Sequence, residues 1–227
     1  MQNKRRSLLS FTGAVALCAL TASAGAAPVE PKNGVEYLTL PEVQATDAGN
    51  KVEVTEFFAY YCPHCHAFDP ALSAWVKSQG ERIVFKRVHV AHHPQVVPQQ
   101  RLYFTLEAMG LLAQYHDKVF AAMHGPERNR MNSDELAFSW AEKNGIDRAR
   151  FIDAYRSFGV GARVRRADAM MAAYRVDSWP LVAVDGRFVT SPYQASQGLA
   201  SASEAQQHQA VVKVLDHLVA KARAERK

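Results

Sequence analysis

The hydrophobic pattern of the chain opens with two strands that flank a helix. Val52–Phe58 alternates and then becomes continuously apolar, as a buried strand does, and Ile83–Val90 has the same character. Between them, apolar side chains recur at helical spacing from Cys62 until Gly80, which predicts a helix. Strand, helix and strand in this order predict a βαβ unit. A short apolar run at Val35–Leu40 predicts one strand before it.

A block of helices follows, separated from the βαβ unit by Pro94 and Pro98. Glycines between the periodic segments act as helix stops. The predicted helices are Arg101–Met109, Leu112–Met123, Asp134–Lys143, Asp147–Phe158 and Val160–Tyr174.

Strand character then returns at Leu181–Val184 and Arg187–Thr190, joined by Asp185-Gly186, a strong hairpin signal. Glu204–Arg223 closes the chain as an amphipathic helix. The opening βαβ and the closing ββα together predict an α/β fold built on one sheet, with the helical block inserted. We predict a first part at 27–96, a helical insertion at 97–175 and a second part at 176–227.

Residues 1–26 predict an export signal. Lys4–Arg6 is a short basic start, Leu8–Leu20 is apolar, and Ala24-Gly25-Ala26 fits a cleavage site after Ala26. The apolar run is shorter than the roughly 20 residues that a membrane-spanning helix needs, which leaves an uncleaved anchor as the weaker alternative. Cys18 follows a leucine rather than a small residue, so we interpret it as part of the signal and not as a lipid anchor.

Removal of this segment lowers the formal net charge from +5 to +2 and leaves Cys62 and Cys65 as the only cysteines. Such a small charge gives no reason to expect binding to nucleic acid or to an anionic membrane. An apolar content of 48% suffices for a core without disulfide staples. A bridge between Cys62 and Cys65 closes too short a loop to restrict the unfolded chain much, so the pair indicates chemistry rather than stability.

Cys62-Pro63-His64-Cys65 follows a predicted strand and begins a predicted helix, which is typical of a redox motif. Unpaired N–H groups and the helix dipole stabilise a thiolate at this end of a helix, so we assign Cys62 as the exposed nucleophile. Cys65 returns alongside nearly one turn later as the buried resolving thiol. Pro63 suits an early helical position, and His64 adds a donor that favours the thiolate. A stabilised thiolate favours the reduced enzyme, which predicts a disulfide donor.

Three other interpretations compete. Cys62, Cys65 and His66 also satisfy the C-x-x-C-H pattern of c-type haem attachment in an exported protein. The same three side chains are possible zinc ligands, although no second ligand pair lies nearby. The third alternative is an inert structural bridge, which the loop argument disfavours.

The segment from Glu56 to Cys65, together with Trp179-Pro180 before the Asp185-Gly186 hairpin, resembles the DsbA family of bacterial periplasmic thiol–disulfide oxidoreductases. The resemblance covers essentially the whole mature chain. It implies a thioredoxin-like fold with an inserted helical domain, a periplasmic location, and no cofactor beyond a redox-active Cys62–Cys65 disulfide.

The resemblance also implies roles for residues outside the motif. Pro180 matches the family's cis-proline beside the disulfide, and Trp179 before it would present its backbone to substrate. The family usually has a small or β-branched residue where this chain has Trp179. Glu56 matches a buried acid near the resolving thiol, and Lys86 resembles its charged partner. The alternatives are an ordinary trans proline and a surface Glu–Lys pair.

Exported polypeptides that are still folding are the implied substrates, and a DsbB-type quinone-linked membrane protein is the implied oxidant. A disulfide isomerase or reductase is the nearest alternative. Only Ala27–Asn50 precedes the first long strand, too few residues for a dimerisation domain, so we predict a monomer. His92-His93-Pro94 leads out of the third strand, and its relation to the site stays open.

Overall fold

The computed structural model describes residues 30–226; the predicted signal peptide 1–26, its cleavage after Ala26 and Cys18 lie outside this range. The strands are β1 (Leu38–Thr39), β2 (Val52–Phe58), β3 (Ile83–His89), β4 (Leu181–Val184) and β5 (Phe188–Thr190). They form one sheet in the order β1-β5-β4-β2-β3. Each predicted strand is present, although β1 covers only two residues of the expected run.

The strand β2 lies inside the sheet, between β4 and β3, and its seven residues are all buried. It pairs in parallel with β3 and antiparallel with β4, so the sheet is mixed, and its end delivers the chain to the predicted redox motif. The hairpin between β4 and β5 turns at Asp185 and Gly186, which both have positive φ. A Cβ at Gly186 would lie 2.1 Å from the carbonyl oxygen of Gln44, so only glycine fits there.

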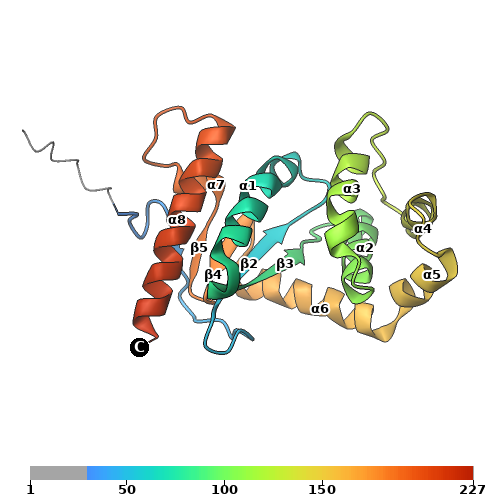
Figure 1. The fold of residues 1–227 in the computed structure, drawn as a ribbon, viewed down its shortest axis with the longest axis horizontal. Coiled ribbons are helices and arrows are strands. Elements are labelled where there is room, and N and C mark those ends of the chain that lie inside the picture. The colour runs from blue at the N-terminus through green and yellow to red at the C-terminus, as the bar shows by residue number, and fades with distance from the viewer. Residues whose placement is uncertain (1–29, 227) are drawn as a thin grey trace, which may run out of the picture.

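Helices cover the sheet and extend beyond it. They are α1 (Pro63–Gln79), α2 (Val97–Ala108), α3 (Leu112–His124), α4 (Asp134–Lys143), α5 (Arg148–Arg156), α6 (Phe158–Ala173), α7 (Pro192–Ala195) and α8 (Glu204–Glu225), with short 3-10 helices at Gly80–Arg82 and Pro94–Val96. Figure 1 shows α1 and α8 beside the sheet, α2–α5 gathered at the other end, and α6 running back beneath the sheet. The helical block predicted between the two halves of the sheet is therefore present.

Two helix boundaries and one additional helix differ from the prediction. Pro98 does not separate α2 from the preceding segment but lies in the first turn of α2. A backbone N–H in that turn has no carbonyl partner within the helix, so a proline there removes no hydrogen bond. Gly159 is not a stop, because it lies inside α6, and Ser157 caps that helix by accepting from Val160 N–H. The four-residue helix α7 was not predicted, since it is too short for a periodic pattern.

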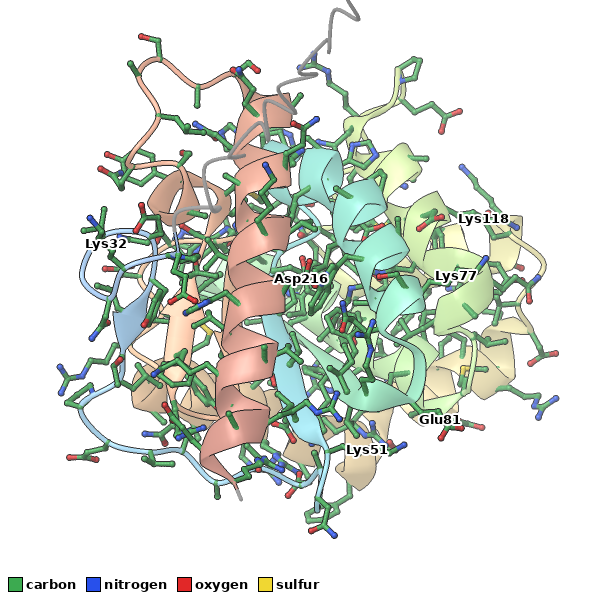
Figure 2. The ribbon with its side chains drawn as sticks, turned by 60° about the vertical axis from the view of Figure 1, so that its left-hand side comes forward. Lys32, Lys51, Lys77, Glu81, Lys118 and Asp216 are labelled. Atoms are coloured by element: carbon green, nitrogen blue, oxygen red, sulfur yellow. The ribbon has the colours of Figure 1, made fainter. Side chains whose placement is uncertain are left out.

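Two hydrophobic cores hold these layers together. One packs α1 and α8 on the sheet and includes Leu72 and Leu218, and the other joins the end of β2 to the inserted helices around Phe58. Asp216 on α8 also links the two outer helices, accepting hydrogen bonds from Trp75 and from Gln79 of α1 (Figure 2). In residues 30–226 no helix combines the length and the apolar character that a membrane crossing requires.

Candidate active site

The two cysteines of the motif lie where β2 passes into α1. Cys62 is the N-cap residue of α1, and its Sγ accepts a hydrogen bond from the Cys65 N–H at 3.4 Å. Both residues are free thiols. Pro63 occupies the first turn, as predicted, because a residue there has no helical hydrogen bond to donate. The pair therefore sits at the positive end of the helix dipole.

The two thiols differ in access. Cys65 has 0% exposure, whereas Cys62 keeps 7%. Cys62 is the more accessible of the two thiols, as predicted. It is nevertheless largely buried rather than exposed. The reason is the backbone of Trp179, whose carbonyl oxygen accepts a hydrogen bond from Cys62 Sγ at 3.6 Å.

The two thiols also differ in acidity. A hydrogen bond from the Cys65 thiol lowers the pKa of Cys62 to about 6, and the backbone N–H groups of Cys65 and His64 act in the same direction against the effect of burial. Burial raises the pKa of Cys65 far above its ordinary value, and the neighbouring Cys62 and Glu56 add to this rise. At neutral pH the nucleophilic thiolate is therefore on Cys62.

His64 points away from the sheet, toward the start of α8. Its Nδ1 lies 2.9 Å from Oε1 of Glu204, and both side chains are well exposed. The hydrogen bond to Glu204 raises the pKa of His64, which increases the share of the imidazolium form. That positive charge lowers the pKa of Cys62, so the predicted contribution of His64 reaches the thiol through space.

Trp179 and Pro180 face the motif from the start of β4. Their peptide bond is cis, as the resemblance implied. The indole of Trp179 packs edge-on against Tyr61, with ring centroids 6.0 Å apart, and lies 5.0 Å from the ring of His92. Tyr61 and His92 are themselves joined by a 2.7 Å hydrogen bond between the phenol oxygen and Nδ1. His92 thus borders the site, a relation that the sequence left open.

The prediction that Lys86 is the charged partner of Glu56 is wrong. The partner of Glu56 is Arg87, whose Nε donates to Oε2 at 2.8 Å. In the parallel register Glu56 lies opposite Arg87, and because side chains alternate along a strand, Lys86 points to the other face of the sheet. There it pairs with Glu53 at 2.7 Å and Asp47 at 3.1 Å.

Glu56 belongs to a buried polar network that sequence reasoning missed. Arg87 also donates to Asp69 of α1 at 2.6 Å, and Asp69 lies 3.3 Å from Nε2 of His116 on α3. The other ring nitrogen of His116 is 2.9 Å from the phenol oxygen of Tyr60. Burial raises the pKa of Glu56, which makes it a carboxyl group that can exchange a proton beside Cys65. Arg87 could have been identified only from the register between β2 and β3, which places it opposite Glu56.

A hollow opens beside the motif on the side of α8. Its volume is about 390 Å³, and His64, Trp179, Pro180 and Tyr193 are among the residues that line it. The ring of Tyr193 is 70% exposed, so the hollow has an apolar wall open to solvent. Among the residues described, no group of three His, Cys, Asp or Glu side chains is placed to hold a metal ion.

A low-pKa thiol at a helix N-terminus, a buried second thiol and a facing cis-proline on a mixed sheet define a thioredoxin-fold thiol–disulfide oxidoreductase. The chain matches the DSBA-like thioredoxin domain family over residues 53–204. It is 36% identical over 215 residues to the thiol:disulfide interchange protein DsbA of Bordetella parapertussis, covering 94% of this chain and 98% of that protein. The DsbA of Pseudomonas aeruginosa is 30% identical over 194 residues, 86% of this chain and 87% of its own length.

The fold comparison agrees with the sequence comparison. The crystal structure of Pseudomonas aeruginosa DsbA superposes with a TM-score of 0.76 at 27% identity, covering 85% of this chain and 94% of that one. The chain therefore belongs to the DSBA-like thioredoxin domain family, and it is a thiol:disulfide interchange oxidoreductase. The fold prediction is confirmed, and the family favours thiol chemistry over the haem and metal-carrier alternatives.

Proposed function

We propose that the oxidised protein donates a Cys62–Cys65 disulfide to exported polypeptides that are still folding. A substrate thiolate attacks Sγ of Cys62, forming a mixed disulfide and releasing Cys65 as the leaving thiol. A second substrate thiolate then attacks the substrate sulfur and releases Cys62. The substrate loses two electrons and two protons to become a disulfide, and the enzyme gains them as a dithiol, so no further cofactor is required.

The observation that carries this proposal is the unequal acidity of the two thiols. Cys62 has a pKa lowered to about 6, mainly by the hydrogen bond from Cys65. A thiolate that is stable at neutral pH stabilises the reduced enzyme and is a good leaving group in the second step. Each pKa unit below ambient pH raises the reduction potential by roughly 30 mV. The direction of transfer is therefore from enzyme disulfide to substrate thiols.

Glu56 has a proton-handling role in this proposal. When Cys65 leaves the enzyme disulfide it is buried, and its raised pKa requires a proton at once. Glu56 is also buried, and burial raises its pKa, so its carboxyl group is suited to supply that proton and to take it back on re-oxidation. Arg87 holds the carboxylate in place, and Lys86 has no part in this step.

Trp179 and Pro180 form the substrate-binding edge in this proposal. The Trp179 carbonyl oxygen lies 3.6 Å from Sγ of Cys62, so an extended substrate strand that pairs with this backbone would bring its sulfur to Cys62. The hollow of about 390 Å³ between Trp179 and Tyr193 can take an apolar side chain from the same segment.

The setting of the reaction is the periplasm, with residues 1–26 removed as a signal and a DsbB-type quinone-linked membrane protein as the oxidant. Support comes from the export pattern of the sequence and from family membership. We also propose a monomer, divided into a thioredoxin-like part at 27–96 and 176–227 and a helical insertion at 97–175.

The decisive experiment measures the reduction potential of the mature protein. The protein is equilibrated with glutathione buffers, and its reduced thiols are counted in the wild type and in Trp179→Val, which restores a β-branched residue. We expect a potential well above that of the glutathione pool. A potential near or below that pool would overturn the proposal and favour the reductase or isomerase alternative. Trp179→Val then reports how far the tryptophan itself has retuned the site.

A further inference from the structure

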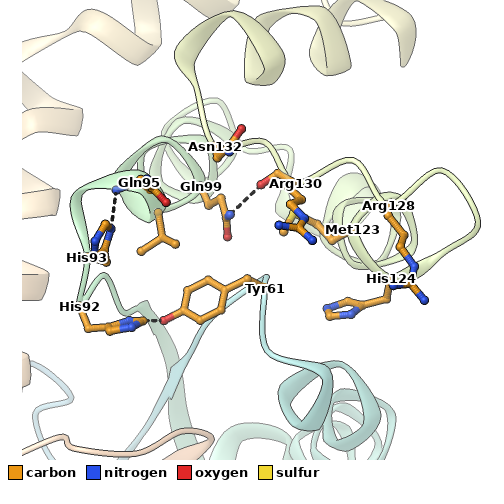
Figure 3. Close-up of a pocket in the computed structure, with 11 residues that line it drawn as sticks. Tyr61, His92, His93, Gln95, Gln99, Met123, His124, Arg128, Arg130 and Asn132 are labelled. Atoms are coloured by element: carbon orange, nitrogen blue, oxygen red, sulfur yellow. Dashed lines mark hydrogen bonds between the residues drawn. The ribbon is translucent and has the colours of Figure 1, made fainter.

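A second and larger hollow is lined by Tyr61, by the segment after β3 and by the inserted helices α2 and α3. Its volume is about 610 Å³, and Tyr61, which directly precedes Cys62, forms part of its wall. Figure 3 shows Tyr61 at the base of this pocket, with His92 and His93 on one side and the loop after α3 on the other. A substrate held at Cys62 would therefore pass the mouth of this pocket.

The Arg side chains that line the pocket are positive, and no acidic side chain lines it. Arg128 and Arg130, from the loop between α3 and α4, both line it, and no Asp or Glu does. Neither guanidinium forms an ion pair with any side chain in residues 30–226. Glu127 belongs to the same loop but is not part of the lining. Two unpaired cations at the wall of one pocket favour an anionic occupant.

The pocket also holds a polar atom without a partner. Gln99 on α2 is 2% exposed, and its Nε2 donates to the Arg130 carbonyl oxygen at 2.7 Å, which fixes the orientation of the amide. Its Oε1 has no partner among the described residues, and Figure 3 shows this oxygen on the pocket side. A buried acceptor left in this way gains a hydrogen bond if the occupant brings an N–H donor. Sulfate and chloride have no hydrogen-bond donor, whereas a peptide segment has both N–H donors and a carboxylate.

We propose that this pocket binds acidic side chains of the polypeptide substrate close to its reacting cysteine. The carboxylate pairs with Arg128 and Arg130, and a backbone or side-chain N–H of the same segment can reach toward Gln99. The inference rests on the proposed disulfide donation, because Cys62 is what brings the substrate to the pocket. It adds a substrate class: cysteines flanked by aspartate or glutamate are oxidised faster than cysteines in neutral sequences.

The test compares two dithiol peptides that differ only in whether the residues beside the cysteines are acidic or the corresponding amides. The oxidised full-length mature protein is mixed with each, and the rate of peptide oxidation is measured at low and high salt. We expect a preference of about three- to tenfold for the acidic peptide at low salt, which is the size that two exposed ion pairs give. Salt should reduce this preference, because it screens exposed charges.

Variants assign the preference to the pocket. The double variant Arg128→Gln/Arg130→Gln should bring the ratio of the two rates close to one, while Arg128→Lys/Arg130→Lys should keep most of it. The control Arg150→Gln/Arg165→Gln removes the same charge from exposed positions that do not line the pocket, and it should behave as the wild type. If the wild type oxidises both peptides at equal rates, or if the preference survives in the first variant, the inference is overturned.

A binding measurement separates this inference from the proposed chemistry. Peptides with serine in place of both cysteines cannot react, and their affinity for the reduced protein is read by fluorescence anisotropy. Tighter binding of the acidic serine peptide, lost in Arg128→Gln/Arg130→Gln, supports the pocket even if the wild type oxidises neither dithiol peptide. In that case disulfide donation fails alone. Equal affinity of the two serine peptides contradicts the pocket assignment whatever the oxidation rates are.

Discussion

At the scale of single residues, the chemistry depends on the different pKa values of two cysteine thiols at the same end of a helix. Cys62 caps α1 and receives hydrogen bonds from the Cys65 thiol and from backbone N–H groups, which stabilise its thiolate. Cys65 is only three positions further on, yet it is fully buried and faces the carboxyl group of Glu56, which disfavours its thiolate. The same residue type therefore serves as nucleophile in one position and as protected thiol in the other.

This difference predicts the pH dependence of alkylation. The rate at which iodoacetamide modifies the reduced protein should follow the Cys62 thiolate, with a midpoint near pH 6. Cys65→Ala should raise the midpoint most, because the Cys65 thiol is the largest cause of the low pKa, and His64→Ala should raise it less. A wild-type midpoint near the ordinary value of 9.0, or a larger shift in His64→Ala, would contradict this assignment.

The site residues that could be predicted from the sequence are those that contact each other within a few positions of the chain. Cys62, Pro63 and Cys65 belong to one helix turn, so their spacing already fixes which atoms meet. The partner of Glu56 is a different case. Lys86 and Arg87 are adjacent basic residues on a strand whose hydrophobic pattern does not mark its two faces, so only the register between β2 and β3 decides which one reaches Glu56.

At the scale of elements, Arg87 joins strand and helix in a buried ionic network. Its guanidinium bridges Glu56 on β2 and Asp69 on α1, and it also donates to Ser73 at 3.0 Å. Burial disfavours the Asp69 carboxylate, yet the hydrogen bond from His116 and the charge of Arg87 hold its pKa below the ordinary value. Arg87 is therefore shared by both carboxyl groups, and Asp69 has a second partner in His116.

Removing this cation should destabilise the fold. Arg87→Met leaves the buried Glu56 without its cation and leaves Asp69 with His116 alone, and we expect the free energy of unfolding to fall by about 3–5 kcal/mol. Lys86→Met is the matched control on the neighbouring residue of the same strand. Its ammonium group is about one-third exposed, and its buried partner Glu53 keeps hydrogen bonds from the Asp47 N–H and the Thr55 hydroxyl, so the expected loss is smaller, about 1–2 kcal/mol. Urea denaturation of the reduced variants measures both. Equal losses would mean that the network is not the structural link described here.

Elements were predictable where the pattern is long and periodic. The strands β2 and β3 and the helix α1 follow directly from their apolar periodicity, and Gly80 ends α1 with a positive φ as expected. The errors involve residues with two possible roles. Pro98 can end one helix or begin another, and Gly159 can separate helices or lie in a first turn, and the capping hydroxyl of Ser157 decides the second case.

At the scale of the whole molecule, two hollows lie beside the redox motif. Trp179 lines one of them and contacts His92, which lines the other. One, of about 390 Å³, is bounded by the ends of α7 and α8, and the other, of about 610 Å³, by the inserted helices. The sheet and α1 supply the reacting thiols, and the segments around them supply surfaces for substrate. The residues that line these hollows come from loops distant in sequence, such as those holding His92 and Arg130, so no local pattern could predict that they meet.

The same thiolate links redox state to the stability of the whole fold. In the reduced protein, the pKa of Cys62 falls from its ordinary value of 9.0, which applies to the unfolded chain, to about 6 in the folded chain. A lowered folded pKa contributes stability that is fully present above 9.0 and is lost as pH falls through about 6. The oxidised protein has no such thiolate and lacks this contribution. The His64–Glu204 pair does not require the thiol, so it contributes to both forms.

Thermal unfolding of the two redox forms should therefore diverge with pH. We expect the melting temperature of the reduced form to rise relative to that of the oxidised form as pH increases from about 6 toward 8.5, and the difference between the two to become independent of pH below 6. The control is the double variant Cys62→Ser/Cys65→Ser, which keeps the shape of the site without a titrating thiol and should follow the pH profile of the oxidised protein. Parallel profiles for the two wild-type forms would mean that the Cys62 thiolate does not favour the reduced fold. The proposed disulfide donor would then lose its thermodynamic basis, because the stability difference between the two forms is what makes the disulfide oxidising.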